Sequence, residues 1–162
     1  MKTVHIVVLV SVLCVLGALT APALWTDSQA QTMDHLMMTP ADLQWADVPS
    51  LPPGAKAAVI EGPLNEAVPF TFRLKFPADY KIPAHWHPAI EHVTVISGTF
   101  NMGTGDKLDT TKTKALSAGS VGIMQPKTHH FGWTQDETII QVHGIGPWAI
   151  NYVNPADDPR KK

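Results

Sequence analysis

The sequence predicts an all-β fold, either a β-sandwich or a small β-barrel, and three observations support this prediction. Fourteen prolines and eleven glycines among 162 residues supply many turns. From Ala55 onward, apolar and polar residues alternate with a period of two. The apolar runs are short and closely spaced, with little helical pattern between them. The length of the chain suits one domain.

Residues 1–30 have a different composition and predict an export signal. Lys2 precedes an almost wholly apolar run over residues 4–19, and the small residues of Ser28–Ala30 suit cleavage after Ala30. A cut near Ala21 is the alternative. A membrane anchor is disfavoured because the apolar run is shorter than the roughly 20 residues that span a bilayer. The protein is therefore expected to be exported, periplasmic or secreted, with no stable membrane anchor after cleavage.

Composition excludes several classes of protein. Cys14 is the one cysteine of the sequence and lies in the predicted signal, so the mature chain would have no disulfide. Its stability must then come from its core, or from its core and a bound metal. A net charge of −2 gives no field that would attract nucleic acid or anionic lipid. The sequence also shows no Ser-His-Asp order and no phosphate-binding glycine loop.

Residues 31–54 are expected to form an N-terminal arm that packs on the main domain. Thr39 suits the N-cap of a short helical turn, with a proline at the first position and Asp42 at the third. Trp45 and Leu51 are the expected anchors of the arm.

The main domain, residues 55–153, contains a series of predicted strands. One strand places Phe70, Phe72, Leu74 and Phe76 on a single face, which is typical of a half-buried strand. Val93 and Val95 are expected to pair with residues 100–103 around a turn at Ser97-Gly98. The later segments are an exposed loop or edge strand over 106–120 with a turn at Ala118-Gly119, strands at 121–124, 138–144 and 147–153, and a polar C-terminal tail over 154–162.

Three good metal ligands stand close together in this domain. His85 and His87 are two residues apart, so in a strand they point the same way. Pro88 ends that strand, and Glu91 begins the next one on the face that is expected to be buried. A buried carboxylate without a partner is costly. Two imidazoles and a carboxylate on one interior wall therefore predict a metal site.

A fourth ligand is expected from a distant strand. His129 and His130 form a second pair of histidines, and because they are neighbours only one of them can face inward from a strand. Their position alone does not choose between them.

The stretch HWHPAIEHVTVISG, residues 85–98, resembles the first sequence motif of the cupins. That motif has two histidines one residue apart, a glutamate four residues further on and a glycine seven after that. Its positions are matched by His85, His87, Glu91 and Gly98. The second cupin motif fits Gly119 and His130, so the resemblance selects His130 over His129.

Two positions depart from the second motif. Gln125 stands at the proline position, with the proline displaced by one to Pro126, and Lys127 stands at the second glycine position. Lysine disfavours the left-handed turn that glycine allows. Lys127 is instead a candidate for the mouth of the site.

The resemblance covers about residues 55–153 and implies a cupin-type jelly-roll β-barrel with a short N-terminal arm. It implies one divalent metal held by His85, His87, Glu91 and His130. This ligand set suits Fe, Mn, Ni, Cu or Zn and leaves the identity of the ion open. Small cupins often dimerise, so the resemblance also suggests a homodimer.

The favoured hypothesis is a metal-dependent enzyme, a dioxygenase-like oxidoreductase acting on a small organic substrate. Four protein ligands leave two positions of an octahedral ion for substrate and dioxygen. The alternatives are a cupin isomerase or lyase, and a non-catalytic periplasmic module that binds metal or a small molecule. No catalytic base is identified.

Other conspicuous side chains receive structural interpretations. His92 is expected to face outward, opposite Glu91. His143 is a candidate for the pocket, with the outer face of the sheet or an interface as the alternative, and Tyr80 is a candidate for the mouth. The tryptophans expected to serve in packing are Trp86, Trp133 and Trp148.

Overall fold

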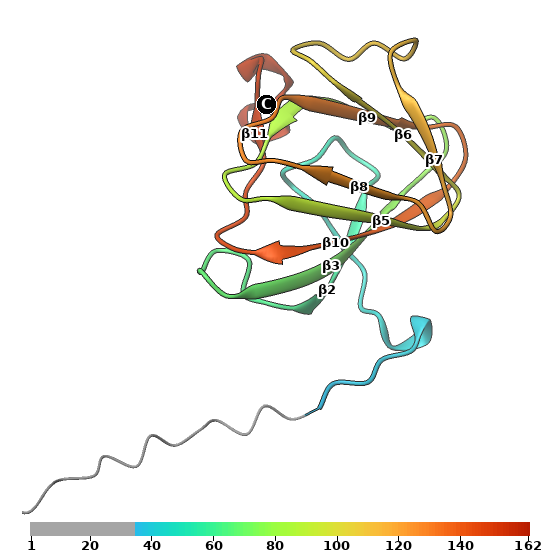
Figure 1. Cartoon of the computed structure of the whole chain (residues 1–162), viewed down its shortest axis with the longest axis vertical. Coiled ribbons are helices and arrows are strands. Elements are labelled where there is room, and N and C mark those ends of the chain that lie inside the picture. The colour runs from blue at the N-terminus through green and yellow to red at the C-terminus, as the bar shows by residue number, and fades with distance from the viewer. Residues whose placement is uncertain (1–34) are drawn as a thin grey trace, which may run out of the picture. The chain divides into compact units, whose positions relative to one another are not determined.

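The computed structural model of the protein describes residues 35–162, and its β-fold lies within the compact unit Met37–Lys162. The unit consists of two antiparallel sheets (Figure 1), so the all-β prediction is confirmed. The predicted export signal and Cys14 lie outside the described residues. Within residues 35–162, no helix is both long enough and apolar enough to cross a bilayer.

The strands divide between a six-stranded and a five-stranded sheet. In spatial order, the six-stranded sheet contains β1 (Ala46–Asp47), β2 (Lys56–Glu61), β3 (Pro69–Phe76), β10 (Thr138–Ile145), β5 (Glu91–Ser97) and β8 (Val121–Met124). The five-stranded sheet contains β11 (Asn151–Tyr152), β4 (Lys81–Trp86), β9 (His130–Thr134), β6 (Thr99–Thr104) and β7 (Lys114–Ser117).

One apolar core joins the two sheets. Buried side chains of β3, β5 and β10 belong to the same cluster as buried side chains of β4 and β6. The period-two prediction for β3 is confirmed, because its inward side chains Phe70, Phe72, Leu74 and Phe76 are at most 6% exposed. Burial of each such side chain contributes about 1.5–3 kcal/mol to folding.

The chain changes sheet between β5 and β6, which corrects the predicted hairpin at Ser97-Gly98. β5 pairs with β10 and β8, whereas β6 pairs with β9 and β7. Gly98 has a φ of +76° at this crossing. Two apolar strands joined by a tight turn fit either arrangement locally. The hairpin prediction fails because β10, distant in the sequence, supplies the hydrogen-bond partner of β5.

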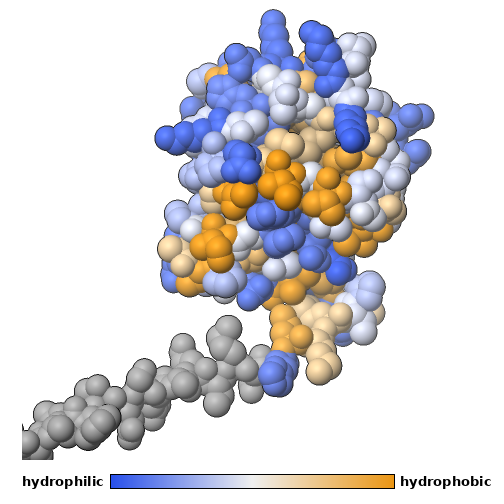
Figure 2. All heavy atoms as spheres, viewed as in Figure 1, coloured by the Kyte–Doolittle hydropathy of each residue, from blue (hydrophilic) through white to orange (hydrophobic). Residues whose placement is uncertain are grey.

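The edge of the five-stranded sheet agrees with the sequence prediction. Of the exposed loop and the edge strand predicted over residues 106–120, the edge strand is present as β7, and the turn at Ala118-Gly119 leads into β8. Apolar side chains gather on the face shown in Figure 2, which displays the outer side of β5, β8 and β10. Exposed apolar residues of these strands are Ile96, Val121, Ile123 and Ile145.

The last predicted strand is shorter than expected, since residues 147–150 lie outside β11.

The arm has the predicted short turn near its start, a 3-10 turn over Pro40–Asp42. The Asp42 carboxylate accepts hydrogen bonds at 2.7 Å from both the backbone N–H and the hydroxyl of Thr39. Leu51 is buried in the core, while Trp45 is half-buried and lies beneath the ammonium group of Lys75, 4.7 Å from the ring centre.

Candidate metal centre

An irregularity in β4 allows His85 to face the interior. The pairing of β4 with β9 shifts register between Ile82 and His85. As a result Ile82 and His85, three residues apart, both line the same internal cavity. His87 follows the strand, lines that cavity too, and is only 3% exposed. The expectation that His85 and His87 point the same way is confirmed, although a regular strand carried on from Ile82 would have turned His85 outward.

The other two side chains come from different sheets. Glu91 begins β5 and is 5% exposed, facing inward with Val93 and Val95 as expected. His130 begins β9 directly opposite His85 in the five-stranded sheet and is 2% exposed. His129 turns away, and its Nδ1 lies 2.6 Å from a carboxylate oxygen of Asp106. The structure therefore brings His130, and not its neighbour, to the cluster.

The three inner imidazoles converge. The ligand atoms of His85, His87 and His130 all lie within 4.8 Å of one another. Their ring planes meet at 52–69° rather than stacking in parallel. Glu91 completes the group, with its two carboxylate oxygens 3.4 Å from Nε2 of His87 and of His130.

Backbone carbonyls orient all three rings. Nδ1 of His85 lies 2.7 Å from the carbonyl of Pro83, Nδ1 of His87 lies 2.8 Å from that of Ala149, and Nδ1 of His130 lies 2.9 Å from that of Thr128. A carbonyl can only accept, so Nδ1 carries the proton in each ring and Nε2 keeps its lone pair. Such outer partners are characteristic of metal-binding histidines.

The electrostatics of the group fit a bound cation. Burial lowers the pKa of His85 well below its ordinary value and also lowers the pKa of His87, so these rings are neutral near pH 7. Burial raises the pKa of Glu91, but positively charged His87 and His130 would bring it to about 2. Because burial keeps His87 neutral, its ring supplies no such charge to Glu91. Lone pairs and a carboxylate then face one another without a donor, which fits a divalent ion with nitrogen and oxygen ligands.

The cavity at this cluster is small and mostly apolar. Its volume is about 30 Å³, room for about two water molecules. Besides the four clustered side chains, its walls are apolar except for Trp148. The apolar wall includes Leu74, Ile82, Val93, Phe100, Met102 and Ile150.

Trp148 lies against the cluster, closer than its expected packing role suggested. Its ring is 4.6 Å from that of His87 and nearly parallel to it, at 21°. The Nε1 atom of Trp148 is buried without a hydrogen-bond partner among the described residues. No sequence pattern pointed to the neighbouring carbonyl of Ala149, because every residue carries a carbonyl and only folding selects one. Trp86 and Trp133 do not line this cavity.

The remaining candidates lie elsewhere. His92 and His143 are opposite each other on the outer face of the six-stranded sheet. This confirms that His92 faces outward and, for His143, confirms the outer face and not the pocket. Their rings stack 4.9 Å apart at 14°, which sets their lone pairs side by side and not toward a common point. Tyr80 is buried against Phe76 and donates its hydroxyl hydrogen to the carbonyl of Pro52, which places it in the core and not at a mouth.

The left-handed turn that lysine disfavours is nevertheless present at Lys127. Its φ is +63°, and its backbone N–H donates to the carbonyl of His87 at 2.8 Å. This bond ties the loop before β9 to the residue after β4, and it helps to offset the cost of the turn. Lys127 itself is exposed.

No protein-family model matches the chain, and a search of curated proteins finds no significant match. Solved structures do resemble it. The polyketide cyclase RemF of Streptomyces resistomycificus is 13% identical, with 78% of this chain and 91% of that chain covered and a TM-score of 0.61. A proposed acetylacetone dioxygenase of Methylibium petroleiphilum PM1 is 15% identical, with 78% and 86% covered and a TM-score of 0.58. An RmlC-like cupin of Shewanella frigidimarina NCIMB 400 is 16% identical, with 67% and 88% covered and a TM-score of 0.54. At these identities the likeness shows a shared fold and leaves the activity open.

Proposed function

Since this chain has the cupin fold, with a jelly-roll arrangement of two antiparallel sheets, we propose that it is a divalent-metal enzyme. In this proposal His85, His87, Glu91 and His130 hold the ion. The observation that carries it is the convergence of three carbonyl-oriented imidazoles and one buried carboxylate. The ion is one of Fe, Mn, Ni, Cu or Zn.

The proposed activity is a dioxygenase-like oxidation of a small organic substrate. A divalent ion in this site supplies Lewis acidity to substrate oxygen atoms and, if redox-active, access to dioxygen. The described residues bind and orient the ion and exclude water from its surroundings. The apolar walls favour a substrate with an apolar body and few polar groups, because the cavity offers little to pair with additional ones. The resemblance to a proposed acetylacetone dioxygenase supports this class of substrate.

A second candidate is a non-catalytic module that binds metal or a small molecule. The cavity volume of about 30 Å³ favours it, since that space admits solvent-sized groups but no larger substrate without movement of the walls. An isomerase or lyase on the same ion remains the further alternative.

Elemental analysis of protein purified from its native source, followed by oxygen uptake with catechols, flavonols and β-diketones, separates these functions. About one ion per chain with oxygen consumption supports the enzyme. Tight metal binding without turnover supports the binding module. No metal under any loading condition overturns the enzyme and leaves only a module that binds a small molecule.

Glu91→Gln tests the carboxylate directly, because it keeps the size of the side chain and removes its charge. We expect the variant to lose most of its bound metal. Unchanged metal content, measured at the same loading, would contradict a ligand role for Glu91.

Export and assembly are separate parts of the proposal. We propose a periplasmic or secreted protein, cleaved after Ala30, and N-terminal sequencing of the protein from a periplasmic fraction tests this. A homodimer stays a prediction that light scattering measures. The exposed apolar side chains over β5 and β8 supply one surface for it (Figure 2).

A further inference from the structure

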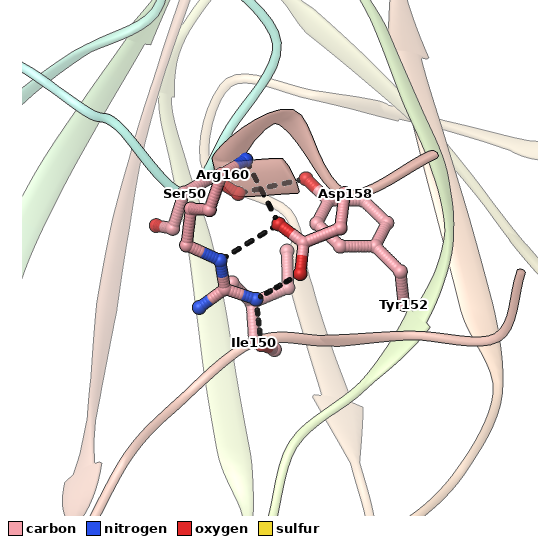
Figure 3. Close-up of polar contacts among 5 residues, drawn as sticks. All are labelled: Ser50, Ile150, Tyr152, Asp158 and Arg160. Carbon is pink, nitrogen blue, oxygen red and sulfur yellow. Dashed lines mark hydrogen bonds and ion pairs between the residues drawn. The ribbon is translucent and has the colours of Figure 1, made fainter. Parts of the chain in front are cut away.

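The C-terminal tail folds back on the segment of the chain that contains Ile150 and Tyr152 (Figure 3). Two 3-10 turns, Pro155–Asp157 and Pro159–Lys161, carry it, and Asp158 between them is 7% exposed. The Arg160 guanidinium makes a bidentate ion pair with the Asp158 carboxylate. Nε donates to Oδ1 at 2.7 Å, and Nη2 donates to Oδ2 at 2.9 Å. This geometry fixes the guanidinium more firmly than a single hydrogen bond would.

The same guanidinium also holds the main chain of the cavity wall. Nη2 of Arg160 donates to the carbonyl of Ile150 at 3.1 Å (Figure 3). The side chain of Ile150 is 4% exposed and lines the metal cavity. Arg160 therefore links the tail to the main chain of a cavity-lining residue, although Arg160 itself does not line the cavity.

The carbonyl of the preceding residue, Ala149, is the one that accepts the Nδ1 proton of His87, at 2.8 Å. Peptide units are planar, so only the two backbone dihedrals of Ile150 separate the Ala149 carbonyl from the Ile150 carbonyl. Because the Ile150 side chain is packed in the core, a hydrogen bond that fixes the Ile150 carbonyl also restricts the direction of the Ala149 carbonyl.

Other contacts anchor the flanks of this segment. Trp148 donates its backbone N–H to the carbonyl of Leu64 at 2.7 Å, and the Tyr152 hydroxyl donates to the carbonyl of Ser50 at 2.8 Å. Between these two points, Arg160 supplies the side-chain contact to the main chain at residue 150.

We propose that Arg160 is a positioning residue for the metal centre. Held by Asp158, it fixes the Ile150 carbonyl, and through it the Ala149 carbonyl that turns Nε2 of His87 toward Glu91 and the other imidazoles. The inference rests on the proposed function, because it names a part of the chain outside the cavity that controls how tightly this site retains its ion.

Zinc affinity of the full chain, measured by competition with a chromophoric chelator, is the first test. We expect Arg160→Gln to weaken Zn²⁺ binding by about 10- to 100-fold, the usual loss when an outer partner of a metal-binding histidine is disturbed. Arg160→Lys should recover part of the loss, because an ammonium group keeps one of the contacts. The matched control is Lys161→Gln, since among the described residues the Lys161 charge is only the smallest of the influences that lower the pKa of Asp158, and Arg160 makes the direct contacts. Its affinity should stay close to that of wild type.

The second test needs no metal. In the metal-free protein, the Nδ1 proton of His87 should exchange with water at least about tenfold faster in Arg160→Gln, as expected if its acceptor carbonyl is released. The Nδ1 protons of His85 and His130 provide the internal control, because their acceptors are the carbonyls of Pro83 and Thr128. Exchange at those two rings should not change.

The outcomes are distinct. A lower melting temperature with unchanged zinc affinity and unchanged His87 exchange would show that Arg160 only stabilises the fold, which overturns the inference. If wild type binds none of Fe, Mn, Ni, Cu and Zn, the proposed function fails, yet the exchange measurement still decides whether Arg160 positions His87. Should Arg160→Gln fail to fold, Asp158→Asn replaces it, because it keeps the guanidinium and removes the charge that holds it.

Discussion

Which ring nitrogen carries the proton decides whether an inner histidine can offer a lone pair to a metal ion. A carbonyl of the main chain holds Nδ1 of His85, His87 and His130, which leaves Nε2 of each ring as an acceptor. The outer pair, His92 and His143, has no such arrangement and lies in parallel planes. Residue type alone therefore does not place a histidine in the cluster. His85, His87 and His130 combine burial, convergence and a main-chain partner at Nδ1.

Adjacent histidines give a matched comparison at this scale. His130→Gln should reduce metal affinity by more than the roughly 10- to 100-fold that loss of an outer hydrogen-bond partner costs, because it removes a nitrogen of the cluster. His129→Gln should leave the affinity unchanged, since His129 turns away toward Asp106. Titration with zinc measures both, and equal losses would contradict the assignment of His130.

Asp158 gives a prediction about pH. Its hydrogen bond from Arg160 lowers the pKa of the folded-state carboxyl below 3.8, so the ionised form stabilises the native state. That contribution is complete above the unfolded pKa of about 4 and is lost as pH falls through the lower folded value. Wild type should therefore exceed Asp158→Asn in unfolding free energy at neutral pH. Denaturant titrations should show this difference shrinking below about pH 4, and a constant difference down to pH 2 would contradict it.

Irregularities of the strands, and not their regular parts, position the site at the scale of elements. The register shift in β4 lets both Ile82 and His85 reach the interior. The crossing at Gly98 sends β5 and β6 into different sheets. Without the first, His85 would face outward, and without the second, the two sheets would not enclose Glu91 together with the histidines of β4 and β9.

Two glycines with similar backbone angles provide a test of the crossing. Gly98 has φ +76° and Gly119 has φ +85°, so alanine costs about 1–2 kcal/mol at either position from the left-handed backbone. A Cβ at Gly98 would also lie 2.5 Å from the carbonyl oxygen of Glu137, whereas nothing lies within 4 Å at Gly119.

Gly98→Ala should therefore lose about 1–3 kcal/mol more than Gly119→Ala, the usual cost of overpacking. Chemical denaturation of the two variants measures the difference. Equal losses would mean that the chain relaxes freely at the crossing.

At the scale of the whole molecule, the proposed ion connects the two sheets. Glu91 belongs to the six-stranded sheet and His130 to the five-stranded sheet, while the predicted mature chain has no disulfide to join them. A ligand that binds only the folded state adds to its stability by mass action. A bound ion would therefore add to the cohesion that the apolar core already gives the two sheets.

Removal of the ion should lower the melting temperature. At a free metal concentration of 100 times the dissociation constant, binding adds about 2.7 kcal/mol, or roughly 10 °C for a domain of this size. Calorimetry with and without a chelator measures the shift. Glu91→Gln is the control, because a variant that retains little metal should not respond to the chelator. A metal-loaded wild type with the same melting temperature after chelation would contradict the link.

Much of this architecture was predictable because it depends on local pattern. Period-two alternation located β3, and the spacing of His85, His87 and Glu91 correctly turned all three toward the interior. The prediction that they share one wall is wrong, because β4 and β5 belong to different sheets. The hairpin at Ser97-Gly98 was predicted wrongly, since β10 is distant in the sequence and competes for β5. The choice of His130 over His129 needed the cupin resemblance, because neighbours in a strand are equivalent in composition until the strand is placed.

The sequence by itself determined the all-β class, three of the four converging side chains (His85, His87 and Glu91) and the absence of cysteine after residue 14, because residue type and spacing carry this information directly. Only the tertiary structure decided which carbonyls orient the histidines, that Trp148 lies against His87, and that the C-terminal tail reaches Ile150. Main-chain groups are chemically alike along the whole chain, so their roles arise only when folding brings particular ones into contact.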